Sequence, residues 1–136
     1  MKILVPVDGS EYSLKAVEKA CDLAKSQPSS LLLVAVGIEL PELEEGRYIA
    51  DKMKAQAEAA LTRAKEVAQK CGTVGEVLLA TGASPAEEIV QVAKDQKVDL
   101  IVIGSRGLAG KTSSFLGSTA SKVVTYSPCS VLVVKN

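Results

Sequence analysis

The sequence of 136 residues contains no histidine and no tryptophan, one phenylalanine and three tyrosines. Without histidine, the chain lacks the side chain that most often transfers protons near neutral pH and most often binds metals. Few aromatic rings argue against single-stranded nucleic acid and against flavin as ligands, because both are commonly held by stacking on such rings. We therefore expect an aliphatic, alanine-rich core.

Clustered positive charge is also missing, since 16 basic residues balance 16 acidic ones and no basic block occurs, so no nucleic-acid partner is expected. The three cysteines, Cys21, Cys71 and Cys129, are widely spaced, which favours buried thiols in a reducing compartment over a zinc site. The apolar run Ser30–Ile38 is too short to span a bilayer, and the first run is interrupted by Asp8 and too short for a signal peptide. We expect a cytoplasmic protein with no membrane partner.

Short apolar runs alternate with longer amphipathic segments along the whole chain. The apolar runs are typical of strands covered on both faces, and they lie at Lys2–Val7, Ser30–Ile38, Gly75–Gly82, Val98–Gly104 and Cys129–Lys135. Helices are expected at about residues 12–25, 48–71, from 85 onward, and 118–126. The second of these has an apolar stripe that should face the core, at Ile49, Met53, Ala57, Ala60, Leu61, Ala64, Ala68 and Cys71. We predict one domain, residues 1–136, of the α/β class: a doubly wound, Rossmann-like fold with five parallel strands in the order 3-2-1-4-5 and helices on both faces.

Local signals indicate where several helices begin or end. Ser10 is a candidate N-cap of the first helix. The segment Ser84–Glu87 reads Ser-Pro-Ala-Glu, a capping box with proline at the first helical position. Gly72 is expected to end the second helix. The segment Glu39–Arg47 before that helix is acidic and contains proline and glycine, which predicts a solvated loop, or else a contact for a partner.

Ligands of doubly wound sheets bind at the carboxyl ends of the strands, where the strand order reverses. Asp8 follows the first strand, Val36 lies near the end of the second, and Gly104 ends the fourth. Because the predicted order makes the first and fourth strands neighbours, we expect Asp8 to lie beside Gly104.

The glycine-rich segment from Gly104 to Ala120 resembles two nucleotide-binding motifs and matches neither. In a P-loop, four residues separate the first glycine from the Gly-Lys-[Ser/Thr] end, but five separate Gly104 from Gly110 here, and more loop follows Lys111. The dinucleotide fingerprint G-x-G-x-x-G requires a different spacing and follows the first strand of its domain. Both interpretations are rejected.

A third interpretation joins the two ends of this segment. Gly104 and Gly107 leave a strand, where glycine permits close backbone approach or positive φ. Gly117, Ser118 and Thr119 open a helix, whose free N–H groups and positive dipole end attract phosphate. Arg106 and Lys111 can add positive charge. The alternative is a flexible loop with Ser118 as an ordinary N-cap, and the spacing alone leaves both open.

The pattern G-x2-G-x9-G-[S/T] after a strand, with PVDGS after the first strand, resembles the universal stress protein family, in particular its ATP-binding branch. The stretches ILVPVDGS, DLIVIGSRG, LGSTASKVV and PCSVLVVK all resemble family positions. The resemblance implies binding of ATP with Mg²⁺. It assigns the ligand contacts to Pro6, Val7, Asp8, Val36, Gly104, Ser105, Arg106, Gly107, Gly117, Ser118 and Thr119.

The same resemblance implies a homodimer paired through the last strand, Cys129–Lys135, which would otherwise be an open apolar edge. Many family members have a histidine where this chain has Arg106, and arginine cannot act as a base near neutral pH, so no catalytic residue is assigned. A receiver domain is rejected because Thr81-Gly82 follows the third strand where an aspartate is required. We expect a regulatory protein that acts through ATP occupancy and contacts with its dimer mate or a partner; a slow ATPase or nucleotide-transferring enzyme is the alternative.

Overall fold

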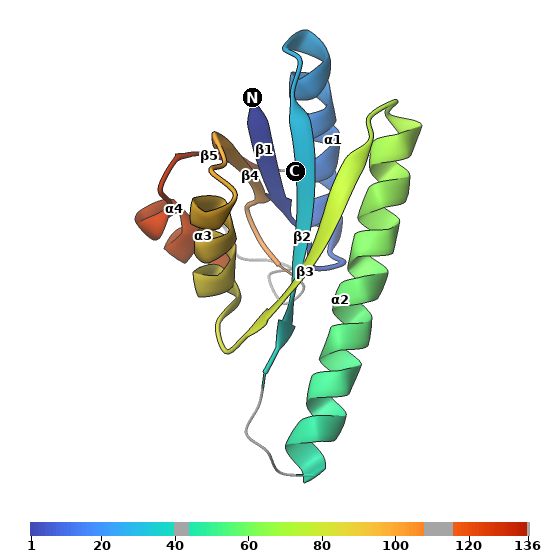
Figure 1. Ribbon diagram of the computed structural model, residues 1–136, viewed down its shortest axis with the longest axis vertical. Coiled ribbons are helices and arrows are strands. Elements are labelled where there is room, and N and C mark those ends of the chain that lie inside the picture. The colour runs from blue at the N-terminus through green and yellow to red at the C-terminus, as the bar shows by residue number, and fades with distance from the viewer. Residues whose placement is uncertain (40–43, 108–115, 136) are drawn as a thin grey trace.

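The computed structural model describes residues 1–39, 44–107 and 116–135. In chain order the elements are β1 (Lys2–Pro6), α1 (Glu11–Ser26), β2 (Ser30–Ile38), α2 (Glu44–Lys70), β3 (Gly75–Gly82), α3 (Pro85–Asp95), β4 (Leu100–Gly104), α4 (Ser118–Tyr126) and β5 (Ser130–Val134). The strands pair in parallel in the order β3-β2-β1-β4-β5 (Figure 1). The predicted fold class and strand order are confirmed.

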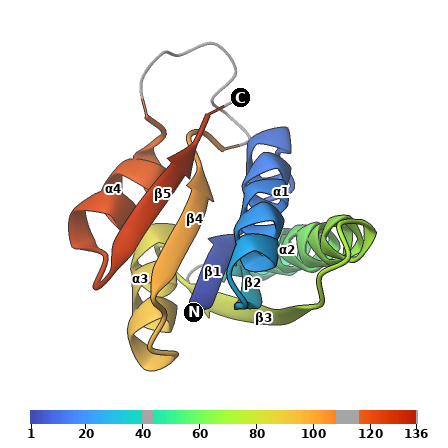
Figure 2. The same cartoon turned by 90° about the horizontal axis from the view of Figure 1, so that it is seen from above.

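Helices cover both faces of the sheet: α1 and α2 pack on one face, α3 and α4 on the other (Figure 2). Successive strand residues therefore alternate between two cores. Ile3 and Val5 of β1 face the first pair of helices, and Leu4 faces the second. Burial on both faces is why the strands are continuously apolar rather than alternating with polar residues.

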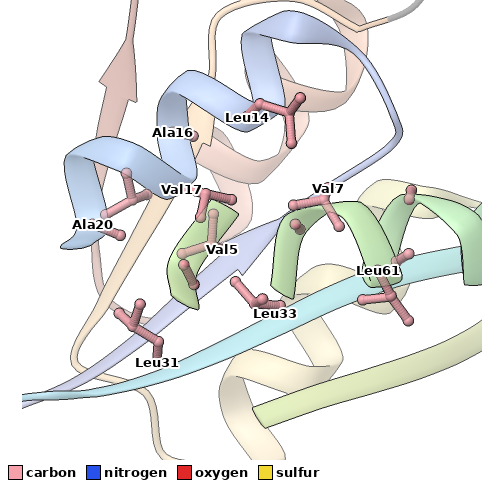
Figure 3. Close-up of a cluster of buried hydrophobic side chains, with 14 of the residues drawn as sticks. Val5, Val7, Leu14, Ala16, Val17, Ala20, Leu31, Leu33 and Leu61 are labelled. Carbon is pink, nitrogen blue, oxygen red and sulfur yellow. The ribbon is translucent and has the colours of Figure 1, made fainter. Parts of the chain in front are cut away.

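The larger core lies between the sheet, α1 and α2 (Figure 3). Val5 and Leu33 from the strands, Val17 from α1 and Leu61 from α2 meet there. Burying a side chain of this size contributes about 1.5–3 kcal/mol. The packed centre holds β1 and β2 rigidly, so the residues that follow these strands are held in fixed positions.

Helix α2 is longer than predicted. The prediction that the whole segment Glu39–Arg47 forms a loop is therefore wrong from residue 44 onward. The helix begins at Glu44, not at Tyr48. Glutamate is among the better helix formers, which explains why the helix extends to residues 44 and 45. Residues 40–43 of the predicted loop lie outside the described residues. The predicted apolar stripe is buried from Ala57 to Ala68, whereas Ile49 is 44% exposed.

β4 and β5 are shorter than predicted, and Ser10 and Ser84 cap their helices as predicted. β4 starts at Leu100 because the Val98 N–H donates instead to the Ala93 carbonyl, 3.0 Å away, which closes α3. β5 lacks both terminal residues of the predicted range. The Ser10 hydroxyl accepts from the Ser13 N–H at 3.2 Å, and Ser84 caps α3 in the same way. Among the residues described, no helix combines the length and apolarity that a membrane crossing requires.

Candidate functional site

A cavity of about 510 Å³ opens at the carboxyl edge of the sheet, around the ends of β1, β2 and β4. The strand order reverses between β1 and β4, so the cavity occupies the usual ligand position of this fold. The predicted site residues that line it are Pro6, Val7, Asp8, Val36, Gly104, Arg106, Gly107, Gly117, Ser118 and Thr119. Residues 98 positions apart in the sequence, such as Asp8 and Arg106, are thereby brought to one site.

Ser105 is the one predicted site residue that does not line the cavity. Its N–H donates to the Val134 carbonyl at 2.9 Å, and its own carbonyl accepts from the Gly117 N–H at 2.7 Å. The side chain is buried. Ser105 therefore connects β5 to the start of α4 and positions Gly117.

Asp8 both stabilises a turn and faces the cavity. One carboxylate oxygen, Oδ1, accepts from the Ser10 N–H at 2.9 Å and closes the turn through Gly9, whose φ of +88° favours glycine. The Ser13 hydroxyl accepts from the Asp8 N–H at 3.4 Å. The other oxygen, Oδ2, lies toward Gly107: a Cβ added there would be 2.8 Å from it. Asp8 thus stabilises the turn before α1 and still presents an oxygen at the cavity.

Close packing, and not positive φ, explains the glycines that leave β4. Neither Gly104 nor Gly107 has a positive φ. A Cβ at Gly104 would lie 2.7 Å from the Tyr12 carbonyl oxygen in the first turn of α1. The missing side chains let the backbone after β4 approach α1 and Asp8 directly.

The start of α4 is uncapped. Gly117 occupies the N-cap and provides no side chain to the N–H groups of the first turn, so the alternative that Ser118 is the N-cap is wrong. A Cβ at Gly117 would lie 3.2 Å from the Arg106 Cα. Ser118, Thr119 and Ala120 of this turn line the cavity. The positive end of the helix therefore faces the cavity without an acceptor from its own cap.

Arg106 adds a positive charge at the same end of the cavity. Its guanidinium carbon lies 5.9 Å from the centroid of the Tyr12 ring, a cation–π arrangement that orients the side chain. Among the described residues, its Nε is buried and has no hydrogen-bond partner. A buried donor without a partner is costly, so this nitrogen is suited to an acceptor supplied from outside the chain. Lys111, the other predicted cation, lies outside the described residues.

The opposite wall of the cavity is mainly apolar. Val36 was predicted as a site residue there, but its other residues were not. It includes Ile38 of β2, Met53, Gln56 and Ala57 of α2, and Pro85 and Ile89 of α3. Met53 and Ala57 were recognised as part of the apolar stripe of α2. Their place at the cavity depends on how far α2 extends past the sheet, which the spacing of apolar residues does not reveal.

The cavity thus joins an apolar wall to an end with an arginine and an uncapped helix N-terminus. This arrangement is suited to a ligand with a flat apolar part and an anionic part, and it defines a doubly wound domain with a cavity of small-molecule size at its switch point. The sequence profile of the universal stress protein family matches residues 1–135. The chain belongs to the universal stress protein family.

Individual relatives agree with this assignment. The universal stress protein YxiE of Bacillus subtilis (strain 168) is 38% identical, covering 98% of both chains. Among solved structures, universal stress protein UspA from Lactobacillus plantarum is 28% identical with a TM-score of 0.84, over 98% of this chain and 97% of that one.

Two similar structures contain adenine nucleotides. One is a universal stress protein in complex with cAMP, 27% identical with a TM-score of 0.74, over 98% of this chain and 96% of that one. The other is the universal stress protein from Archaeoglobus fulgidus in complex with dAMP, 25% identical with a TM-score of 0.77, with the same coverage of both chains.

Proposed function

We propose that this chain binds ATP in the cavity at the switch point and acts as a nucleotide-dependent regulatory protein. The observation that carries the proposal is the buried, unpartnered Nε of Arg106 beside the uncapped start of α4. Both features call for a multivalent anion, and the apolar wall calls for a base next to it. The cAMP and dAMP complexes of similar proteins support an adenine base.

The two ends of the cavity suggest how the nucleotide lies. The adenine ring would pack between Val36 and Ile38 of β2 and Met53 of α2, all of which line the cavity. The phosphates would receive hydrogen bonds from the first N–H groups of α4 and from Arg106. Asp8 Oδ2, between these ends, would accept from the ribose hydroxyls or from water bound to Mg²⁺, which usually keeps several waters and is held largely by phosphates.

We also propose that the protein forms a homodimer through β5, in the cytoplasm, where its thiols stay reduced. β5 is an edge strand with β4 on one side only. Its residues Val131–Val134 are only half-buried, and Val124 and Tyr126 of the neighbouring α4 are exposed. An unpaired apolar edge of this kind is protected when it pairs with a second copy. A change of shape at the start of α4 on binding would be transmitted along α4 to this interface or to another partner.

The direct test is to denature the freshly purified protein and identify released nucleotide by mass spectrometry, then to titrate the emptied protein with ATP, AMP and CTP by calorimetry. We expect released adenine nucleotide, and affinity for ATP in the micromolar range, tighter than for CTP. No binding of ATP by the emptied protein would refute the proposal. Sustained hydrolysis of several ATP per second that is lost in Asp8→Ala would instead identify an enzyme, because Asp8 is the one carboxylate among the described residues that line the cavity.

A further inference from the structure

Helix α2 is held against the edge of the cavity at two points. At the end of β2, a Cβ added at Gly37 would lie 3.5 Å from the Cα of Lys54. At the turn after β1, a Cβ added at Gly9 would lie 3.9 Å from the Cβ of Ala60. The part of α2 between these contacts is therefore fixed beside the carboxyl ends of both strands, and Figure 1 shows α2 running on past the end of β2.

One face of this part of α2 turns toward the cavity. Met53, Gln56 and Ala57 are three and four residues apart, which places them on one face of the helix, and all three line the cavity. Ala57 is buried, Met53 is half-buried and Gln56 is exposed. Gln56 thus lies at the rim of the cavity, beside the apolar wall.

Gln56 differs chemically from the rest of this wall. Among the described residues of β2, α2 and α3 that line the cavity, it alone has a side chain that can both donate and accept a hydrogen bond. A base packed against this wall can therefore be read by one side chain of the wall, that of Gln56. The other polar side chains around the cavity lie near the start of α1 or at the anionic end, and they are Asp8, Ser13, Arg106, Ser118 and Thr119.

The amide of glutamine matches one edge of adenine. The edge with the 6-amino group presents a hydrogen-bond donor beside an acceptor, N7, whereas the same edge of guanine presents two acceptors, O6 and N7. The glutamine amide has an oxygen that accepts and a nitrogen that donates. It can therefore bond both groups of adenine at once, but only one of guanine.

We propose that Gln56 pairs with the 6-amino group and N7 of the bound base, and so makes the site prefer adenine to guanine. The amide oxygen accepts from the 6-amino group, and the amide nitrogen donates to N7. The inference rests on the proposed nucleotide binding and adds to it the side chain that selects the base.

The test measures dissociation constants of ATP, GTP and 7-deaza-ATP, which has a carbon in place of N7, by calorimetry on the emptied protein. The wild type is compared with Gln56→Met, because methionine keeps the length and helix propensity of glutamine but lacks the amide. We expect the wild type to bind 7-deaza-ATP and GTP at least about 5- to 10-fold more weakly than ATP, since each loses a hydrogen bond to Gln56. In Gln56→Met both ratios should fall by about this factor.

Gln69→Met is the matched control, because Gln69 is exposed on the same helix and does not line the cavity, and it should keep the wild-type ratios. Unchanged ratios in Gln56→Met would overturn the inference and leave the proposed ATP binding in place. An equal loss of affinity for all three nucleotides would also overturn it, because Gln56 would then contact a part that they share. No binding of ATP by the wild type would overturn both the inference and the proposed function.

Discussion

Arg106 has a permanent charge, and its guanidinium group lies over the ring of Tyr12. Its neighbours Gly107 and Gly117 have no side chains that could shield it from the cavity. A ligand phosphate would meet both the charge and the unpartnered Nε. At the scale of single residues, this is the group whose removal should alter binding most.

Replacing Arg106 by glutamine should weaken ATP binding about 10- to 100-fold, the effect of losing a charged hydrogen bond worth roughly 1.5–3 kcal/mol. Calorimetry with ATP measures the change. Arg63→Gln, on an exposed position of α2 away from the cavity, is the control and should bind like the wild type. Equal affinities of the two variants would show that Arg106 does not contact the ligand.

Gly104→Ala tests the close approach of β4 to α1. The added methyl group would lie 2.7 Å from the Tyr12 carbonyl oxygen, which is backbone and cannot rotate away. We expect a loss of about 1–3 kcal/mol in the free energy of unfolding, measured with urea. Gly72→Ala is the contrasting variant: its methyl group has open space, and only its φ of +81° opposes the change, at a cost of about 1–2 kcal/mol. A fully stable Gly104→Ala variant would contradict the packing.

At the scale of elements, the burial of the Cys21 thiol of α1 in the core makes stability depend on pH in the alkaline range. Burial raises the Cys21 pKa from 9.0 to about 11. The unfolded chain therefore loses this proton first, and the stabilisation is complete below pH 9 and falls as the pH rises toward 11. The loss amounts to at most about 2–3 kcal/mol.

Urea unfolding of the reduced protein between pH 8 and 11 measures this dependence. The free energy of unfolding should fall more steeply in the wild type than in Cys21→Ala, which has no thiol to ionise in the unfolded state. Cys129→Ala serves as the control and should follow the wild-type slope. Parallel curves for the wild type and Cys21→Ala would mean that the buried thiol contributes nothing to the pH dependence.

Element positions were predicted well where local chemistry decides them and less well elsewhere. Ser10 and Ser84 mark the starts of α1 and α3 because their hydroxyls cap these helices. The start of α2 was missed by four residues, since Glu44 and Glu45 suit either a loop or a first helical turn. The alignment of α2 with β2 was not predictable, so Met53 and Gln56 were absent from the expected site.

At the scale of the whole molecule, strand order was predictable because short crossovers leave few topologies for alternating strands and helices. That order was sufficient to place Asp8 and the glycines after β4 at one site. The orientation of Ser105 was not predictable, because it depends on hydrogen bonds to Val134 and Gly117 from two other elements. Topology thus determines which segments meet, and packing determines which side chains face the cavity.

Val133→Pro should separate the proposed dimer without unfolding the monomer. The Val134 carbonyl accepts from Ser105 across the β4 edge, so by strand alternation the Val133 N–H points to the open edge. Proline there removes a hydrogen bond only from a second copy. Light scattering should report a dimer for the wild type and a monomer for this variant, with unchanged circular dichroism. Leu132→Pro, whose N–H faces β4, should lose stability as well. A dimeric Val133→Pro protein would exclude pairing through β5.

The cavity takes its walls from β1 near the beginning of the chain and from α4 near its end. During synthesis, the site is therefore incomplete until Gly117 to Thr119 have left the ribosome and packed beside Asp8. A nucleotide that binds the finished site can stabilise only chains that are complete to α4. Bound nucleotide would then stabilise finished molecules and not truncated ones. Intact copies of this protein would therefore persist longer in the cell than truncated copies.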